Sequence, residues 1–113
     1  MNSFKTRVIA GKGRGRKLGF PTANLDRTNL KIDYGVYLAE IKANGKWYKA
    51  LLHFGQRKTF NEGVSLEVYI KDFNFDIYHQ EVEVKVIKKI REVKRFKSAE
   101  ELKEQIKRDF ELI

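Results

Sequence analysis

Residues suited to phosphate and metal chemistry gather near the start of the chain. Residues 11–17 hold three glycines and four basic residues. Gly11, Gly13 and Gly15 would let the backbone approach a ligand closely and direct N–H groups at an anion. The spacing matches neither a Walker A loop nor a dinucleotide fingerprint. From glycine and charge alone, a mobile basic loop explains the segment equally well.

The residues that follow this loop are candidate metal ligands. Thr22 and Asn24 come two positions apart, directly after Pro21. In extended backbone, residues two apart point the same way. A hydroxyl and an amide oxygen so aligned suit Mg²⁺, which takes few protein ligands and completes its shell with phosphates and water. The alternative is that both side chains hydrogen-bond a turn, and the residue types alone favour that role.

The composition limits the classes of partner. A net charge of +9 predicts a polyanionic partner, which could be nucleic acid, anionic lipid or a phosphorylated small molecule. The bases concentrate in residues 1–25 and 85–97. The absence of cysteine excludes a thiolate nucleophile and cysteine-ligated zinc. It also fits a cytoplasmic protein. At 113 residues we expect one domain, over residues 1–113. No apolar segment approaches the ~20 residues that span a bilayer, so we expect no membrane contact.

The elements that must position these residues are mainly strands. Alternating or β-branched segments predict strands at residues 4–10, 35–43, 46–54, 64–71 and 81–90. Asn44-Gly45 between the second and third of these is a strong hairpin signal. Short connections between at least five strands predict an antiparallel sheet or barrel.

The C-terminal segment has helical periodicity. Ser98 and Glu101 form a capping box, in which each side chain accepts a hydrogen bond from the other's backbone N–H. An apolar stripe then recurs every three or four residues, at Leu102, Ile106, Phe110 and Ile113. We expect this helix to pack against the barrel.

The order V-x-x-G-x-x-x-G-R-x-L-G-F-P-T-A-N-L over residues 8–25 resembles the signature of the ATP-dependent riboflavin kinases. That domain occurs in eukaryotes and in bacterial bifunctional FAD synthetases. The resemblance continues in collinear order through GVY, G-x-x-x-T-F, LEV, DF-x-x-DIY, R-x-x-x-x-F-x-S and the helix spacing of Leu102, Gln105, Ile106 and Asp109. It covers nearly the whole chain, and GFPTAN is its most specific part.

The resemblance implies a six-stranded antiparallel Greek-key barrel with a C-terminal helix. It implies transfer of the γ-phosphoryl group of ATP to the 5′-hydroxyl of riboflavin, which yields FMN and ADP. Mg²⁺ would be the metal, with Zn²⁺ or Mn²⁺ as alternatives, and the two small molecules would be the partners of a monomer, without nucleic acid. No HxGH-type nucleotidyltransferase motif is present, so we expect this chain to stop at FMN.

The same resemblance assigns roles to eight residues. Thr22 and Asn24 fall on the Mg²⁺-nucleotide ligands, Gly11, Gly15 and Arg16 on the phosphate loop, Glu67 on the catalytic base, and Arg91 and Phe96 on the flavin side. For Glu67, strand alternation alone favours an ordinary exposed residue. Only its place in LEV supports the catalytic role.

The chain departs from the family pattern at five positions, namely Thr6, His53, Lys58, His79 and Val93. The two histidines are too few for a histidine metal site, and we interpret each as an ordinary strand or surface residue. Two other functions stay open from the sequence. One is a basic β-barrel that binds single-stranded nucleic acid, with the Gly/Arg loop as an arm and exposed aromatic side chains for stacking. The other is a flavin-binding module that has lost turnover. We interpret Trp47, beside the Asn44-Gly45 turn, as a packing residue.

Overall fold

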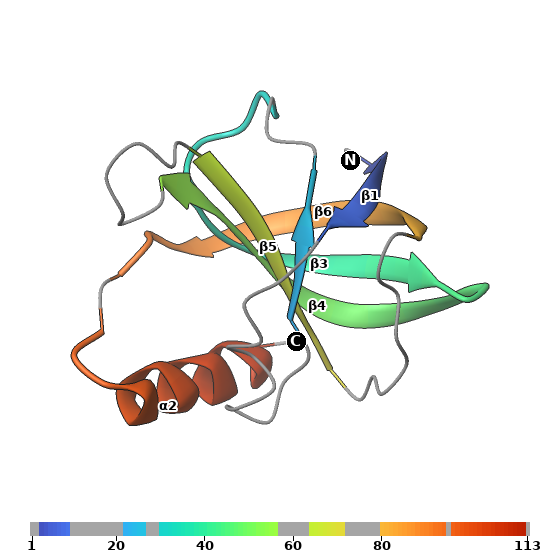
Figure 1. Cartoon of the computed structure of the whole chain (residues 1–113). Helices are drawn as coiled ribbons and strands as arrows, with labels where there is room; N and C mark the ends of the chain where they lie inside the picture. The colour runs from blue at the N-terminus through green and yellow to red at the C-terminus, as the bar shows by residue number, and fades with distance from the viewer. Residues whose placement is uncertain are drawn as a thin grey trace.

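The structure is a computed structural model that describes residues 3–9, 22–26, 30–56, 64–71, 80–94 and 96–112. These residues form six strands and a helix (Figure 1): β1 Ser3–Ile9, β2 Thr22–Leu25, β3 Gly35–Ala43, β4 Lys46–Gln56, β5 Val64–Ile70, β6 Glu81–Arg91 and α2 Ala99–Phe110. Within them, no helix has the length and apolar character needed to cross a membrane.

The strands close into a barrel in the order β1-β2-β5-β4-β3-β6, and every pairing is antiparallel. Strands β3, β4 and β5 follow one another, and β6 returns to pair with β3, which is the Greek-key arrangement. The expected six-stranded barrel is confirmed. The short strand β2, which the pattern indicated only as extended chain, closes the barrel between β1 and β5.

The β3–β4 hairpin turns at the predicted dipeptide. Asn44 has φ 53° and Gly45 has φ 78°, the left-handed conformations that a type I′ turn requires. The pairing runs without interruption from Ala43 opposite Lys46 to Gly35 opposite Phe54. The turn therefore sets which residues of β3 and β4 share a face.

The barrel interior is filled by one side of each strand. Residues at most 1% exposed include Ala39 and Ile41 on β3, Leu52 on β4, Val68 on β5 and Val84 on β6. Burying a side chain of this size contributes about 1.5–3 kcal/mol relative to leaving it exposed. Because side chains alternate along a strand, the residues between these positions lie on the outer wall of the barrel.

Helix α2 lies against that outer wall, away from the β3–β4 turn (Figure 1). Ile106 and Phe110 pack with Leu38, Leu51 and Tyr69, which alternate with interior residues of β3, β4 and β5. The predicted contact between helix and barrel is confirmed.

The helix begins as predicted, with one difference. The N–H of Glu101 donates to Ser98 Oγ at 3.2 Å, so Ser98 is the N-cap. The Glu101 carboxylate accepts from the N–H of Lys97 at 3.1 Å, one residue before the expected partner. The reciprocal contact of the capping box is therefore shifted toward the preceding chain.

Candidate active site

Strands β2 and β5 bring two predicted site residues directly opposite each other. Asn24 pairs with Glu67 across the antiparallel ladder. In such a pair the Cβ atoms lie about 4.5–5.5 Å apart on the same face. The adjacent residues Leu25 and Val68 fill the barrel interior, so Asn24 and Glu67 both lie on the outer wall. An amide and a carboxylate far apart in sequence thus share one place on the wall.

The pair belongs to a longer row across the barrel. Glu67 lies opposite His53 on β4, and His53 lies opposite Val36 on β3. Val36 in turn lies opposite Arg91, at the end of β6. We call Asn24, Glu67, His53, Val36 and Arg91 the outer row. It crosses five strands and connects three of the predicted site residues, Asn24, Glu67 and Arg91.

The outer row is shielded although it lies outside the barrel. Asn24 is 6% exposed and Val36 2% exposed. Glu67 and His53 are half-buried. Charges and dipoles in such a place interact more strongly than on an open surface, because less water screens them. The row therefore offers polar groups in a setting where they can act on a ligand.

Part of this shielding comes from the segment that follows β6. Gly55 lies two positions beyond His53 and faces the same way. A Cβ built on Gly55 would lie 3.2 Å from Cγ2 of Val93, closer than most Cβ contacts. The glycine therefore lets the chain after β6 approach β4 beside the outer row.

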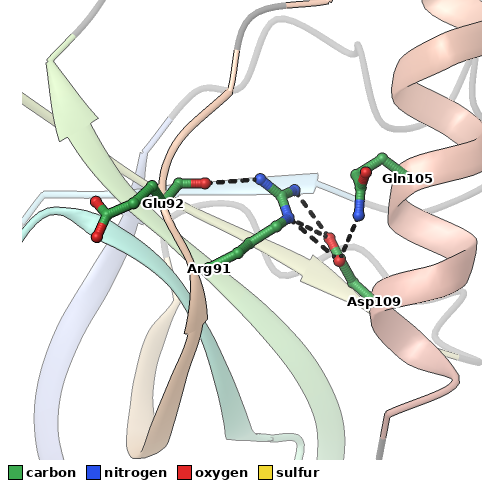
Figure 2. A network of polar contacts seen from close by, with 4 residues as sticks. All are labelled: Arg91, Glu92, Gln105 and Asp109. Carbon is green, nitrogen blue, oxygen red and sulfur yellow. Dashed lines mark hydrogen bonds and ion pairs between the residues drawn. The ribbon is translucent and has the colours of Figure 1, made fainter.

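The far end of the row is held by α2 (Figure 2). Arg91 Nε donates to Asp109 Oδ1 at 3.2 Å and Oδ2 at 3.1 Å, and Nη2 donates to Oδ2 at 2.8 Å. Nη1 donates to the carbonyl oxygen of Glu92 at 3.0 Å. Gln105 Nε2 donates to Asp109 Oδ1 at 2.9 Å. The guanidinium is thus fixed on two sides.

Phe96 lies near this guanidinium. Its ring centroid is 6.0 Å from Cζ of Arg91, and its side chain is half-buried. The structure therefore brings together the two residues that were predicted for the flavin side. Their contact with a flavin stays a prediction.

The remaining predicted residues lie at or beyond the edge of the described chain. Thr22 begins β2, with its backbone opposite Tyr69, and its side chain is outside the described part. Gly11, Gly15 and Arg16 lie outside the described residues. Ile9, the last residue of β1, lies opposite Asn24. The glycine-rich segment therefore connects the end of β1, which lies beside Asn24, to the start of β2 at Thr22, two residues before Asn24.

The oxygen groups around Asn24 suit a hard cation for which the protein supplies only some of the ligands. The amide oxygen of Asn24 and the carboxylate of Glu67, its partner across the ladder, are oxygen ligands of this kind. The Thr22 hydroxyl stays a predicted ligand, because its side chain lies outside the described part of the chain. Among the described residues, no group of three histidines, cysteines or acids could form a cage for a metal ion. Mg²⁺ is held in this way, through one or two protein groups plus phosphate oxygens.

Sequence reasoning missed His53, which it treated as an ordinary strand residue. The structure places it between Glu67 and Val36 in the outer row. The Asn44-Gly45 turn could have predicted that His53 faces Val36, because it fixes the β3–β4 register. No comparable turn signal sets the pairing of β4 with β5, so the neighbourhood of His53 and Glu67 could not be predicted.

A family model described as flavokinase, riboflavin kinase, matches residues 2–113. The chain is 38% identical over 108 residues to an RNA-binding riboflavin kinase of Bacillus subtilis, covering 94% of this chain and 47% of that protein. It is also 38% identical over 108 residues to the bifunctional riboflavin kinase/FMN adenylyltransferase of the same organism, covering 90% of this chain and 34% of that protein. The chain thus spans less than half the length of these curated relatives.

Two solved structures share the fold. A protein described as a macrolide-efflux protein from Streptococcus pneumoniae superposes with a TM-score of 0.84 at 35% identity, over 97% of this chain and 37% of that one. A riboflavin kinase from Trypanosoma brucei superposes with a TM-score of 0.62 at 23% identity, over 99% of this chain and 78% of that one. The second likeness supports the barrel architecture alone.

Proposed function

The chain belongs to the riboflavin kinase family, and we propose that it transfers the γ-phosphoryl group of ATP to the 5′-hydroxyl of riboflavin to form FMN and ADP. The pairing of Asn24 with Glu67 carries this proposal. Phosphoryl transfer needs a metal-nucleotide and an acceptor hydroxyl held in line more than it needs covalent help. The amide oxygen of Asn24 would serve the metal-nucleotide, and the carboxylate of Glu67 would serve the acceptor hydroxyl.

Glu67 serves the acceptor. Its carboxylate orients the 5′-hydroxyl and accepts the proton as the bond from the 5′-oxygen to the γ-phosphorus forms. The bond from that phosphorus to the leaving ADP oxygen breaks in the same step. Glu67 is half-buried and lies between His53 and Asn24 along the row, so its carboxylate is partly shielded from water beside the proposed metal ligand.

Asn24 and Thr22 serve the nucleotide, as ligands of a divalent cation. We assign Mg²⁺, because a hydroxyl and an amide oxygen are hard donors, whereas Zn²⁺ favours nitrogen and sulfur ligands in closed sites. When bound, Mg²⁺ neutralises negative charge on the phosphate oxygens. Gly11 and Gly15 contribute backbone N–H groups to the phosphates, and Arg16 contributes a charge. The position of Ile9 opposite Asn24 supports this, since the glycine-rich segment starts two residues after Ile9, at Gly11.

Arg91 and Phe96 serve the flavin. A guanidinium and an aromatic ring 6.0 Å apart at the end of the outer row suit a planar ring system with polar edges. We propose a cytoplasmic monomer, because ATP is the donor and a single chain supplies every residue of the row.

The charge pattern argues against nucleic acid as the partner. On the outer wall of β1, β6 and β3, Glu83 lies between Lys5 and Lys42. Nζ of the neighbouring Lys85 lies 3.8 Å from Oε1 of Glu40. Trp47, which we interpreted as a packing residue, is 37% exposed and lies outside the core. Two lysines cover its ring, however, and alternating charge gives no continuous track for a phosphate backbone.

The test is to incubate the protein with riboflavin, ATP and Mg²⁺ and to resolve the products by chromatography. We expect FMN and ADP in equal amounts, and neither after chelation of the metal. Riboflavin binding without FMN would identify a module that has lost turnover. Absence of riboflavin binding, with salt-sensitive binding of an oligonucleotide, would identify the nucleic-acid function instead.

A further inference from the structure

We infer that Asp109 and Gln105 of α2 are positioning residues for riboflavin, acting through Arg91. The inference rests on the proposed function and extends it to a helix that the reaction itself does not require. Asp109 is 2% exposed, and its carboxylate accepts from both Arg91 and Gln105. A buried carboxylate with these two partners has one orientation, and it imposes that orientation on the guanidinium.

The hydrogen bonds leave part of the guanidinium available. Nε and Nη2 bind Asp109, and Nη1 binds the carbonyl oxygen of Glu92. Arginine has five N–H donors. One N–H on Nη1 and one on Nη2 have no acceptor in the part of the chain that the structure describes. Arg91 is therefore held at fixed points while it keeps donors for a ligand.

The ion pair also selects the charge of that ligand. The Arg91 side chain is 15% exposed and that of Asp109 is 3% exposed, so the two charges compensate each other away from water. An anionic phosphate would gain little from such a neutral pair. The ring of riboflavin is uncharged and carries carbonyl oxygens, which are suitable acceptors for the two remaining N–H groups. The pair thus fits the ring of the acceptor rather than the phosphates of the donor.

The same guanidinium connects three parts of the molecule. It ends strand β6, binds helix α2 through Asp109, and holds the first peptide of the segment at residues 92–98 through Glu92. That segment carries Phe96, whose ring lies 6.0 Å from Arg91. Without the Asp109 carboxylate, the Arg91 guanidinium would no longer be fixed. The segment that it holds through Glu92 would then leave the barrel in a less defined direction.

The experiment measures riboflavin affinity by quenching of flavin fluorescence, with ADP and Mg²⁺ present so that no turnover occurs. We expect Arg91→Lys and Asp109→Asn each to raise the Kd for riboflavin at least tenfold, and Gln105→Ala about threefold. The KM for ATP should stay within twofold of wild type. Asp109→Glu, which keeps the carboxylate, should recover part of the affinity lost in Asp109→Asn.

Glu104→Gln is the matched control, because it removes an exposed carboxylate from the same helix. Its riboflavin Kd should equal that of wild type. Where Asp109→Asn fails to fold, Gln105→Ala and Arg91→Lys carry the test, since each leaves the Asp109 carboxylate in place. Folded Arg91→Lys and Gln105→Ala proteins with wild-type riboflavin Kd would overturn the inference, even if their melting temperatures fell.

The inference and the proposed function fail in different ways. A wild-type protein that makes no FMN contradicts the proposed function. A wild-type protein that makes FMN, together with folded variants of unchanged riboflavin affinity, contradicts only the positioning role. A rise in the KM for ATP equal to the rise in riboflavin Kd would also contradict it, because it would indicate general damage to the fold.

Discussion

The outer wall of the barrel has two halves of opposite character. On β1, β6 and the adjoining edge of β3, lysines and glutamates alternate across the strands, as in Lys5, Glu83 and Lys42. On β2, β5 and β4, the outer row carries Asn24, Glu67 and His53 in shielded positions. Both halves are built from alternating strands with the same interior.

The difference shows that charge and function are separated in this protein. The net charge of +9 first suggests that the most basic surface binds the partner. In the charged half, however, opposite charges neutralise one another and water screens them. The functional candidates lie where polar groups are few but shielded. Burial of polar side chains locates the candidate site better than charge does.

The largest expected effect comes from replacing one glutamate in each half by glutamine and comparing the two variants. Glu67→Gln should lower kcat at least tenfold, about 1.4 kcal/mol in the barrier, because the amide cannot accept the hydroxyl proton. The KM for ATP should change little. Glu83→Gln is the matched control, since Glu83 is also half-buried on the outer wall, and its kcat should be unchanged. Steady-state FMN formation measures both, and near-normal turnover by Glu67→Gln would remove it as the base.

Next in size are the metal ligands. Asn24→Ala and Thr22→Ala should each raise the Mg²⁺ concentration for half-maximal activity by about tenfold, a loss of about 1.4 kcal/mol in binding. The oxygen ligands would then have to come from water. Gln80→Ala, which truncates an exposed amide at the start of the charged half, should leave the Mg²⁺ titration unchanged. An unaltered titration for both ligand variants would argue against the assignment.

A polar contact outside both halves should affect stability alone. Thr6 Oγ1 donates to Asp26 Oδ1 at 2.6 Å, and this bond lowers the pKa of Asp26 below its ordinary value. A lowered pKa gives stability that is present above the unfolded value and lost as pH falls through the folded one. Asp26→Asn should therefore lower the melting temperature at pH 7 by roughly 2–4 °C, since Asp26 is exposed and screened.

The same substitution should cost progressively less stability below about pH 4, because the carboxylate of the unfolded wild-type chain takes up a proton there, while the folded carboxylate stays ionised to lower pH. Thermal melts of both proteins between pH 2 and pH 7 give the comparison. Thr6→Val removes the hydrogen-bond donor. Its loss of melting temperature relative to wild type should therefore also shrink as the pH falls below about 4. A difference in melting temperature that stays constant across this range would contradict the role of the charged carboxylate.

The smallest effect is expected in the charged half. Lys42 and Lys85 lie over the ring of Trp47 at 6.0 and 5.0 Å. Replacing both by alanine should leave kcat/KM for riboflavin and ATP within twofold at physiological salt, because neither residue adjoins the outer row. A severalfold rise in the KM for ATP that disappears at high salt would instead make this half a surface that steers the nucleotide.

The parts of the fold that depend on local chemistry could be predicted from the sequence. Asn44-Gly45 set the β3–β4 turn, and Ser98 set the start of α2. Alternation showed that Glu67 faces away from Leu66 and Val68, which fill the core. Strand β2 was harder, because four residues after a proline are too few for a periodic signal.

The candidate site was predicted by residue type but not by arrangement. That Asn24 faces Glu67 depends on pairing strands separated by two others in the chain, and no turn specifies that register. His53 was missed for the same reason. Arg91 was assigned to the flavin without its partner, because the ion pair to Asp109 depends on where α2 packs. Non-local packing therefore supplied what the sequence pattern could not.

The most direct test of the paired arrangement is a double-mutant cycle on kcat/KM with Asn24→Ala, Glu67→Gln and the two combined. If Asn24 and Glu67 act on one reaction centre, the double variant should be little slower than the slower single variant, because the second loss removes an interaction already impaired. If instead the fold-losses of the two single variants multiply in the double variant, the residues act independently, and the shared site on the outer wall is contradicted.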